Sequence, residues 1–145
     1  MASLTAFAPP GSVCTDTLSL SFEARQKSRF LARLESGEAV GIFLPRGAIL
    51  RDGDCLTGPE GRVVRVRCQP ESVSVVMIAD PDLRATTCYH LGNRHVPLQI
   101  LPGELRYLTD HVLDDLIRQR GLQVAHAQLP FEPEPGAYQG LPHGH

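Results

Sequence analysis

Residues Cys88–Ile100, which read CYHLGNRHVPLQI, join the end of a helix to the start of a strand. A helical pattern enters this stretch from Asp80, and Gly92–Asn93 supplies residues that tolerate the left-handed conformation at a helix C-terminus. Val96 is pushed into an extended conformation because a proline follows it. We therefore predict that His95 lies at a corner just past a helix end. Such a position suits a ligand or recognition residue.

Alternating β and α patterns surround this stretch. We expect strands at Ser72–Ala79, Val96–Leu101, Glu104–Leu108 and Leu122–Leu129, and helices at Pro81–Leu91 and His111–Arg120. Asp80 caps the first helix, and a proline is well tolerated at the position after the cap. The order strand, helix, strand, strand, helix, strand predicts a ferredoxin-like (βαββαβ) domain with four antiparallel strands and both helices on one face.

Short β patterns without a helical stretch fill the chain from Thr17 to Arg67. Apolar and polar residues alternate from Leu18 to Phe22, and Phe30–Leu34 and Ala39–Leu44 flank a loop that contains a glycine. These patterns predict a small antiparallel β domain. The expected fold class is therefore α+β: an N-terminal small antiparallel β domain, then the ferredoxin-like domain, then a C-terminal tail.

The predicted boundaries place a β-rich domain at residues 1–70, the ferredoxin-like domain at 71–130 and the tail at 131–145. We expect the tail to be flexible because it is rich in proline and glycine and has little to bury.

The composition excludes several classes of function. The chain has 145 residues, of which 42% are apolar and 21% charged, and this balance is typical of a globular protein. A net charge of -2 gives no reason to expect binding to nucleic acid or an anionic membrane. No apolar run approaches the roughly 20 residues that span a bilayer. The N-terminus lacks the pattern of a signal peptide, so we expect a cytoplasmic protein.

Six histidines are the main candidates for chemistry, and they form no H-E-x-x-H motif. The four cysteines include no C-x-x-C pair, and we interpret them as small buried or half-buried thiols. A single imidazole is a poor metal site, but a twofold axis near His95 would supply two imidazoles from one position. His143 and His145 in the tail would then add nitrogen ligands. Such a thiolate-free site suits Ni, Zn or Cu, and loose ligands suit a carrier.

Other residues have simpler interpretations. His111 near a helix start is a polar first-turn residue as readily as a ligand, and His126 on a strand favours a structural role. Cys88 and Tyr89 are expected to pack into the core between helix and sheet.

The quoted stretch resembles the UreE family of urease accessory proteins, which are nickel metallochaperones. The resemblance covers nearly the whole chain after Thr17. It is carried by Leu44–Gly47, Arg51–Asp54, Cys88–Ile100, Pro102–Tyr107, Asp110–Asp115, Gln128–Glu134 and Gly136–Tyr138.

This resemblance implies an N-terminal domain similar to a peptide-binding domain of heat-shock chaperones. It implies a homodimer through the second domain, with His95 as the shared ligand for Ni(II), and delivery to an activation complex that contains a GTPase and apo-urease. Two departures matter. Thr109 stands where some relatives carry a histidine two residues before the position of His111, and many relatives have a longer His-rich tail than His143 and His145 provide. We therefore expect about one ion per dimer.

Two alternatives stay open at this point. Asn93–Arg94 invites comparison with ferredoxin-like acylphosphatases, and thus with a small metal-dependent or acylphosphatase-like enzyme, although the sequence shows no nucleophile–base pair at useful spacing. The other alternative is a protein-binding module without metal transfer, in which the β domain recognises an extended peptide.

Overall fold

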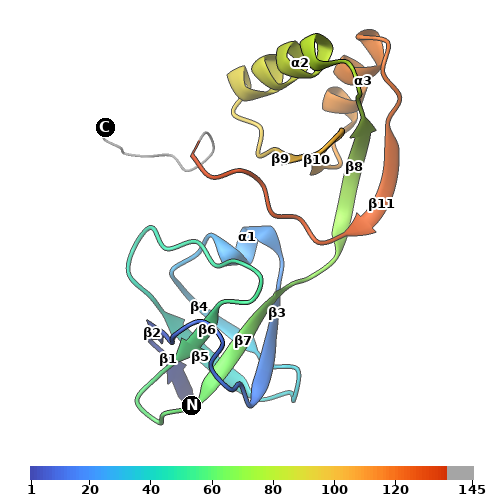
Figure 1. The fold of residues 1–145 in the computed structure, drawn as a ribbon. Coiled ribbons are helices and arrows are strands. Elements are labelled where there is room, and N and C mark those ends of the chain that lie inside the picture. Colours follow the sequence, from blue (N-terminus) through green and yellow to red (C-terminus); the bar gives the residue numbers. More distant parts are fainter. Residues whose placement is uncertain (137–145) are drawn as a thin grey trace. The chain divides into compact units, whose positions relative to one another are not determined.

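The computed structural model describes residues 1–136, and the chain divides into two compact units, Met1–Gln69 and Pro70–His145 (Figure 1). The first unit consists of short strands and one short helix. In chain order these are β1 (Ala2–Leu4), β2 (Ala6–Phe7), β3 (Asp16–Leu20), α1 (Phe22–Arg25), β4 (Arg29–Arg33), β5 (Ala39–Phe43), β6 (Cys55–Thr57) and β7 (Val63–Cys68).

The strands of the first unit form two sheets, ordered β1-β5-β4 and β2-β6-β7-β3. The predicted hairpin is present, because β4 pairs with β5 in antiparallel fashion. The β character of the unit is confirmed, but the antiparallel description needs correction, since β1 pairs with β5 and β3 with β7 in parallel. Parallel partners are joined by long connections, and local hairpin patterns carry no signal for them.

The expectation of no helix before Arg67 is wrong at α1. The alternation from Leu18 ends at Leu20, and Ser21 then caps a short helix by accepting a hydrogen bond from the Ala24 amide at 3.2 Å. Phe22 begins this helix and buries its ring. Local capping therefore ends the strand that the periodicity alone would extend.

The second unit contains β8 (Glu71–Met77), α2 (Pro81–Asn93), β9 (Gln99–Leu101), β10 (Glu104–Leu108), α3 (His111–Gln119) and β11 (Ala125–Leu129). Its strands pair in the order β11-β8-β10-β9, and every pairing is antiparallel. This order and the alternation of helices confirm the ferredoxin-like arrangement. The predicted strands are shorter than expected at their starts, at Gln99 and Ala125, and α2 extends to Asn93.

Both helices of the second unit cover the same face of the sheet (Figure 1). Leu91 of α2 and Ile117 of α3 belong to one buried apolar cluster with Val76, Leu105 and Tyr107 of the sheet. This shared core fixes the end of α2 against β9 and β10, and so it positions the corner that carries His95. No helix among residues 1–136 has the length and apolarity needed to cross a membrane.

Candidate metal centre

The end of α2 is closed by two backbone hydrogen bonds. The His95 amide donates to the Gly92 carbonyl at 2.9 Å, and the Val96 amide donates to the Leu91 carbonyl at 3.2 Å. This pair of bonds is the Schellman motif, in which a residue just past the helix adopts the left-handed conformation. Leu91 and Val96 both pack in the core of the second unit, which supplies the apolar contact that accompanies the motif.

His95 itself occupies the left-handed position, with φ of 57°. The expectation that Gly92 or Asn93 would do so is wrong, because both still belong to α2. Within the described residues, every other positive φ falls on a glycine. A side chain in this conformation costs about 1–2 kcal/mol relative to the ordinary right-handed region. The fold therefore keeps a histidine where glycine would be easier to accommodate.

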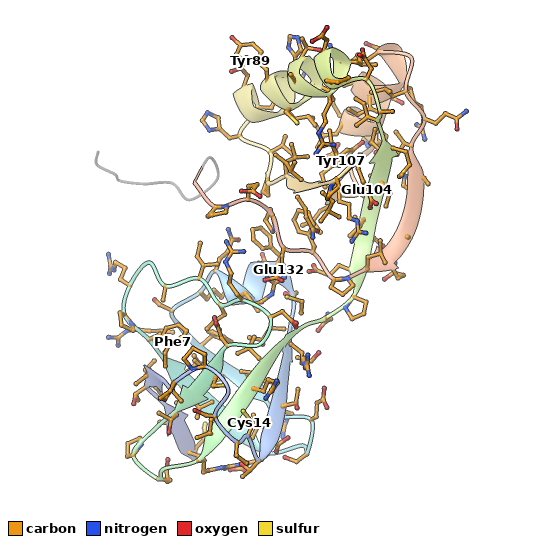
Figure 2. The ribbon with its side chains drawn as sticks, in the orientation of Figure 1. Phe7, Cys14, Tyr89, Glu104, Tyr107 and Glu132 are labelled. Atoms are coloured by element: carbon orange, nitrogen blue, oxygen red, sulfur yellow. The ribbon has the colours of Figure 1, made fainter. Side chains whose placement is uncertain are left out.

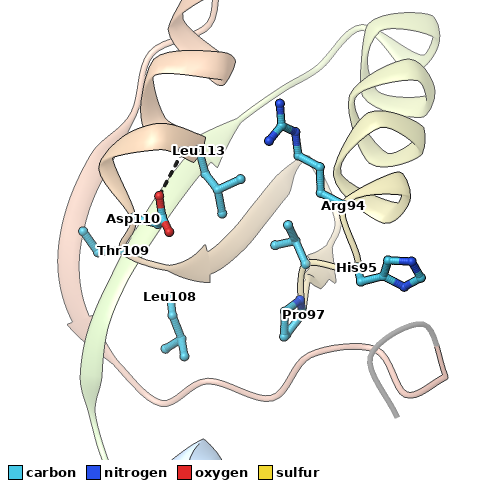
Figure 3. Close-up of a pocket in the computed structure, with 8 residues that line it drawn as sticks. Arg94, His95, Pro97, Leu108, Thr109, Asp110 and Leu113 are labelled. Atoms are coloured by element: carbon cyan, nitrogen blue, oxygen red, sulfur yellow. Dashed lines mark hydrogen bonds between the residues drawn. The ribbon is translucent and has the colours of Figure 1, made fainter. Parts of the chain in front are cut away.

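The imidazole of His95 is exposed, as the corner position predicts. A cavity of about 350 Å³ lies beside it, and Figure 3 shows the ring pointing away from Leu108 and Leu113 on the other side of that cavity. The lining includes Val96 and Pro97, so apolar surface adjoins the imidazole. Among residues 1–136, no hydrogen bond to the His95 ring nitrogens is present, so they are available to a ligand from outside this part of the chain.

His111 and His95 line different hollows. His111 is the first residue of α3 and lines a separate hollow with Asp115 and Gln119. Arg94 lines both this hollow and the cavity beside His95. A guanidinium has no lone pair to offer a metal, so Arg94 is not a ligand.

The remaining described histidines have other surroundings. His90 is exposed, and its ring makes an edge contact with Tyr89 at 5.6 Å between centroids. Tyr89 is 66% exposed, so the expectation that it packs into the core is wrong, whereas Cys88 does pack against the core. Burial raises the pKa of the Cys88 thiol, which keeps it protonated and unsuited to metal binding.

His126 has the structural role that the sequence favours, within a buried network that the sequence did not reveal. Its Nε2 lies 2.7 Å from Oδ2 of Asp114, whose Oδ1 accepts hydrogen bonds from the Tyr107 hydroxyl at 2.6 Å and the Ser74 hydroxyl at 2.7 Å. Burial alone would raise the pKa of Asp114, but these three donors outweigh it and lower the pKa. The sequence offers one signal for this network: Asp114 is a carboxylate three positions before the apolar Ile117, and so lies on the same side of the helix.

The last described residues pass beside the corner that carries His95. The Glu134 amide donates to the Leu98 carbonyl at 2.8 Å, and a small cavity of about 160 Å³ is lined by Gly92 and Val96 together with Glu134 and Pro135. His143 and His145 lie outside the described residues. The prediction that the tail is flexible also concerns residues outside that range. Among residues 1–136, no cluster of three or more His, Cys, Asp or Glu side chains is close enough to hold a metal ion. A metal site at His95 therefore needs ligands from elsewhere.

A β unit followed by a ferredoxin-like unit, with an exposed imidazole fixed at one corner, defines a small two-domain α+β protein. Two family models match it: the N-terminal domain of the UreE urease accessory protein over residues 5–69, and the C-terminal domain over residues 71–145. The chain belongs to the UreE family of urease accessory proteins. UreE proteins are chaperones of urease maturation and not enzymes, so the acylphosphatase-like alternative is set aside.

Individual relatives agree with the family models. The chain is 57% identical to the urease accessory protein UreE of Alkalilimnicola ehrlichii over 140 residues, which cover 97% of this chain and 86% of the relative. It is 57% identical to that of Citrobacter koseri over 132 residues, which cover 90% and 87%. It is 51% identical to that of Pseudomonas putida strain GB-1 over 138 residues, which cover 94% and 84%.

Proposed function

We propose that this chain carries Ni(II) as cargo and delivers it for assembly of the urease active site. The observation that carries the proposal is His95, an exposed imidazole in a left-handed backbone conformation. Strained backbone persists where the surrounding structure holds it in place, and such positions concentrate at binding sites. Membership of a urease accessory family supports nickel as the ion.

The site is completed by a homodimer through the second unit. One imidazole per chain holds a metal poorly, and a twofold axis beside His95 brings in a second. The apolar lining next to His95, including Val96, Pro97 and Leu113, offers surface for this contact. Val112 on α3, in the neighbouring hollow that Arg94 also lines, is 52% exposed. Two imidazoles then face each other across the axis.

The C-terminal tail supplies further ligands, because it leaves the described chain beside this corner. Glu134 is hydrogen-bonded to Leu98, and Leu98 is three residues after His95 in the sequence. His143 is seven positions after Gly136, the last described residue, and a chain of that length reaches at most about 25 Å. We therefore expect His143 and His145 to reach the ion from the end of the described chain.

Imidazole ligands suit Ni(II), and they also accept Zn(II) and Cu(II), which we expect to compete. A site shared between two chains and completed by tails releases its ion when a partner offers better ligands. The partners we propose are the urease accessory GTPase and the apo-urease complex, since the family acts in urease maturation.

Nickel binding to the wild-type chain should saturate at one ion per two chains. In His95→Ala the affinity should fall by more than about 100-fold, because loss of a residue that only supports a ligand already costs 10–100-fold. Equilibrium dialysis with Ni(II), combined with mass measurement in solution, gives both the stoichiometry and the dimer.

The matched control is His90→Ala, which removes another exposed imidazole from the same stretch. This variant should bind nickel as the wild type does. Tight binding that survives in His95→Ala, or a monomer that binds nickel at full strength, would contradict the proposal.

Replacing His143 and His145 together with alanine should weaken nickel binding by about tenfold, or about 1.4 kcal/mol. The stoichiometry should not change, since the paired His95 rings remain. Competition against a coloured chelator measures the affinity. A double variant that loses one bound ion per dimer would instead place a separate site in the tail.

One observation favours an additional role for the first unit as a protein-binding module. β4 is the edge strand of its sheet, and Leu31 on this strand is 71% exposed. Phe43 on the adjacent β5 is 43% exposed. An extended peptide could pair with such an edge and place apolar side chains against it. This role accompanies nickel delivery and does not compete with it.

A further inference from the structure

Two thiols that are far apart in the sequence lie close together in the first unit. Cys14 lies in the connection before β3, and Cys55 is the first residue of β6. Their Sγ atoms are 3.6 Å apart, although the residues are 41 positions apart in the chain. Figure 2 labels Cys14 in the first unit. Neither thiol takes part in the proposed nickel site, because both belong to Met1–Gln69.

The backbone on both sides holds the two sulfurs together. The Ala8 amide donates to the Cys55 carbonyl at 2.8 Å, and the Thr15 amide, next to Cys14, donates to the Val63 carbonyl at 2.9 Å. A disulfide has an S–S distance of about 2.05 Å, so the sulfurs need to approach by about 1.5 Å. Side-chain rotation within two anchored segments covers much of such a distance.

The two thiols differ in how easily a reagent can reach them. Cys14 is half-buried, and its Sγ lies 3.5 Å from the Ser12 carbonyl oxygen. Cys55 is 2% exposed. Burial raises the pKa of the Cys55 thiol, and the hydrogen bond with Cys14 raises it further. A small oxidant therefore meets Cys14 first, while Cys55 stays protonated behind it.

We propose that Cys14 and Cys55 form a reversible oxidation site for hydroperoxides. The Cys14 thiolate attacks the peroxide, its sulfur loses two electrons, and the O–O bond breaks to give a sulfenic acid and an alkoxide or hydroxide. This leaving group takes up the proton that the Cys14 thiol released on ionising, and becomes an alcohol or water. The Cys55 sulfur then attacks the Cys14 sulfur. The S–O bond breaks, an S–S bond forms, and the hydroxyl leaves as water with the Cys55 proton. Two added thiols of a reductant return both cysteines to the reduced state.

The disulfide would close a long loop that contains β3, α1, β4 and β5. Closing a loop of this length restricts the unfolded chain, so the oxidised first unit should melt roughly 10 °C higher than the reduced unit. The inference concerns the first unit only, and it stands whether or not the chain binds nickel.

The test treats the reduced, metal-free full-length chain with a small excess of hydrogen peroxide. Intact mass under denaturing conditions should fall by 2 Da, and the number of free thiols should fall from four to two. Trypsin without reductant should release residues 1–25 joined to 52–62, because each of the four cysteines falls in a different tryptic peptide. Dithiothreitol should reverse the mass change and the rise in melting temperature.

Cys14→Ser and Cys55→Ala should both abolish the 2 Da loss, whereas Cys88→Ser, which removes another half-buried thiol, should retain it. The Cys14 position is partly exposed, so its variant keeps the fold even if Cys55→Ala does not. Several outcomes would overturn the proposal: a gain of 32 Da, a crosslink between two chains, a linked peptide that contains another cysteine, or four thiols that stay free while glutathione is oxidised in the same tube.

Discussion

His95→Gly should stabilise the second unit by about 1 kcal/mol and abolish nickel binding at the same time. The gain comes from the backbone, since glycine adopts a φ of 57° without steric cost while histidine does not. The loss comes from the imidazole, which is the proposed ligand. Most substitutions at a well-packed site destabilise a protein, so a gain in stability with a loss of binding is a distinctive result.

The same unit contains an internal reference for this prediction. At the end of α3, the Gly121 amide donates to the Arg118 carbonyl at 2.9 Å, and the Leu122 amide lies 3.4 Å from the Ile117 carbonyl. These bonds repeat the motif at the end of α2, and here glycine takes the left-handed position with φ of 82°. The two helix ends thus share the same left-handed turn, but a histidine occupies it at the end of α2 and a glycine at the end of α3.

Three variants separate the effect of the backbone conformation on stability from the effect of the imidazole on nickel binding. His95→Ala should lose nickel binding without the gain in stability, because alanine in the left-handed region is strained as histidine is. Gly121→Ala should lose about 1 kcal/mol of stability and keep nickel binding. Guanidinium unfolding of metal-free protein, followed by circular dichroism and by hydrogen exchange of the β8 and β10 amides, measures the changes in the second unit. A less stable His95→Gly would show that the imidazole, and not the backbone, is what the helix end requires.

The position of His95 was predictable from local chemistry, but its conformation was not. The helix start at Asp80 and the corner at His95 follow from residues close together in the sequence. The left-handed residue was placed two or three positions too early because Gly92 and Asn93 are its usual occupants. The apolar pair Leu91 and Val96 decides the position, since their packing in the core fixes which residue turns the chain.

Features that depend on contacts between residues far apart in the sequence could not be predicted from local patterns. The parallel pairing of β3 with β7 joins segments on either side of the β4–β5 hairpin, and alternation along a strand says nothing about which strand lies beside it. The ferredoxin-like order was predictable because that arrangement follows from the order of elements. The histidines illustrate the same limit: the sequence offered His95, His111, His143 and His145 as ligands, while only the fold places Arg94 between the hollows of His95 and His111.

The Asp114 network gives the largest expected loss of stability in the second unit. Asp114 is 2% exposed, and Asp114→Ala removes the acceptor of the buried Tyr107 hydroxyl. It leaves the Ser74 hydroxyl only its longer hydrogen bond of 3.4 Å to the Thr109 hydroxyl. We expect a loss of about 4 kcal/mol, because each buried group without a partner costs about 1–3 kcal/mol. Asp114→Asn keeps the shape and one accepting oxygen, and should lose about 2 kcal/mol at pH 7. Asp115→Asn, on the exposed side of the same helix, is the control and should change stability by less than about 0.5 kcal/mol.

The pH dependence of unfolding should identify the charge on Asp114 as the source of this stability. Its pKa is lower in the folded chain than in the unfolded chain, where it is about 3.9. The unfolded chain therefore takes up protons first as the pH falls, and the contribution of Asp114 is present above about pH 4 and lost below it, as the pH falls through the folded pKa. Guanidinium unfolding at a series of pH values should show the difference between wild type and Asp114→Asn shrinking over that window, because a protonated aspartate and an asparagine are both neutral. A constant difference from pH 7 to pH 3 would mean that the carboxylate acts through its shape alone.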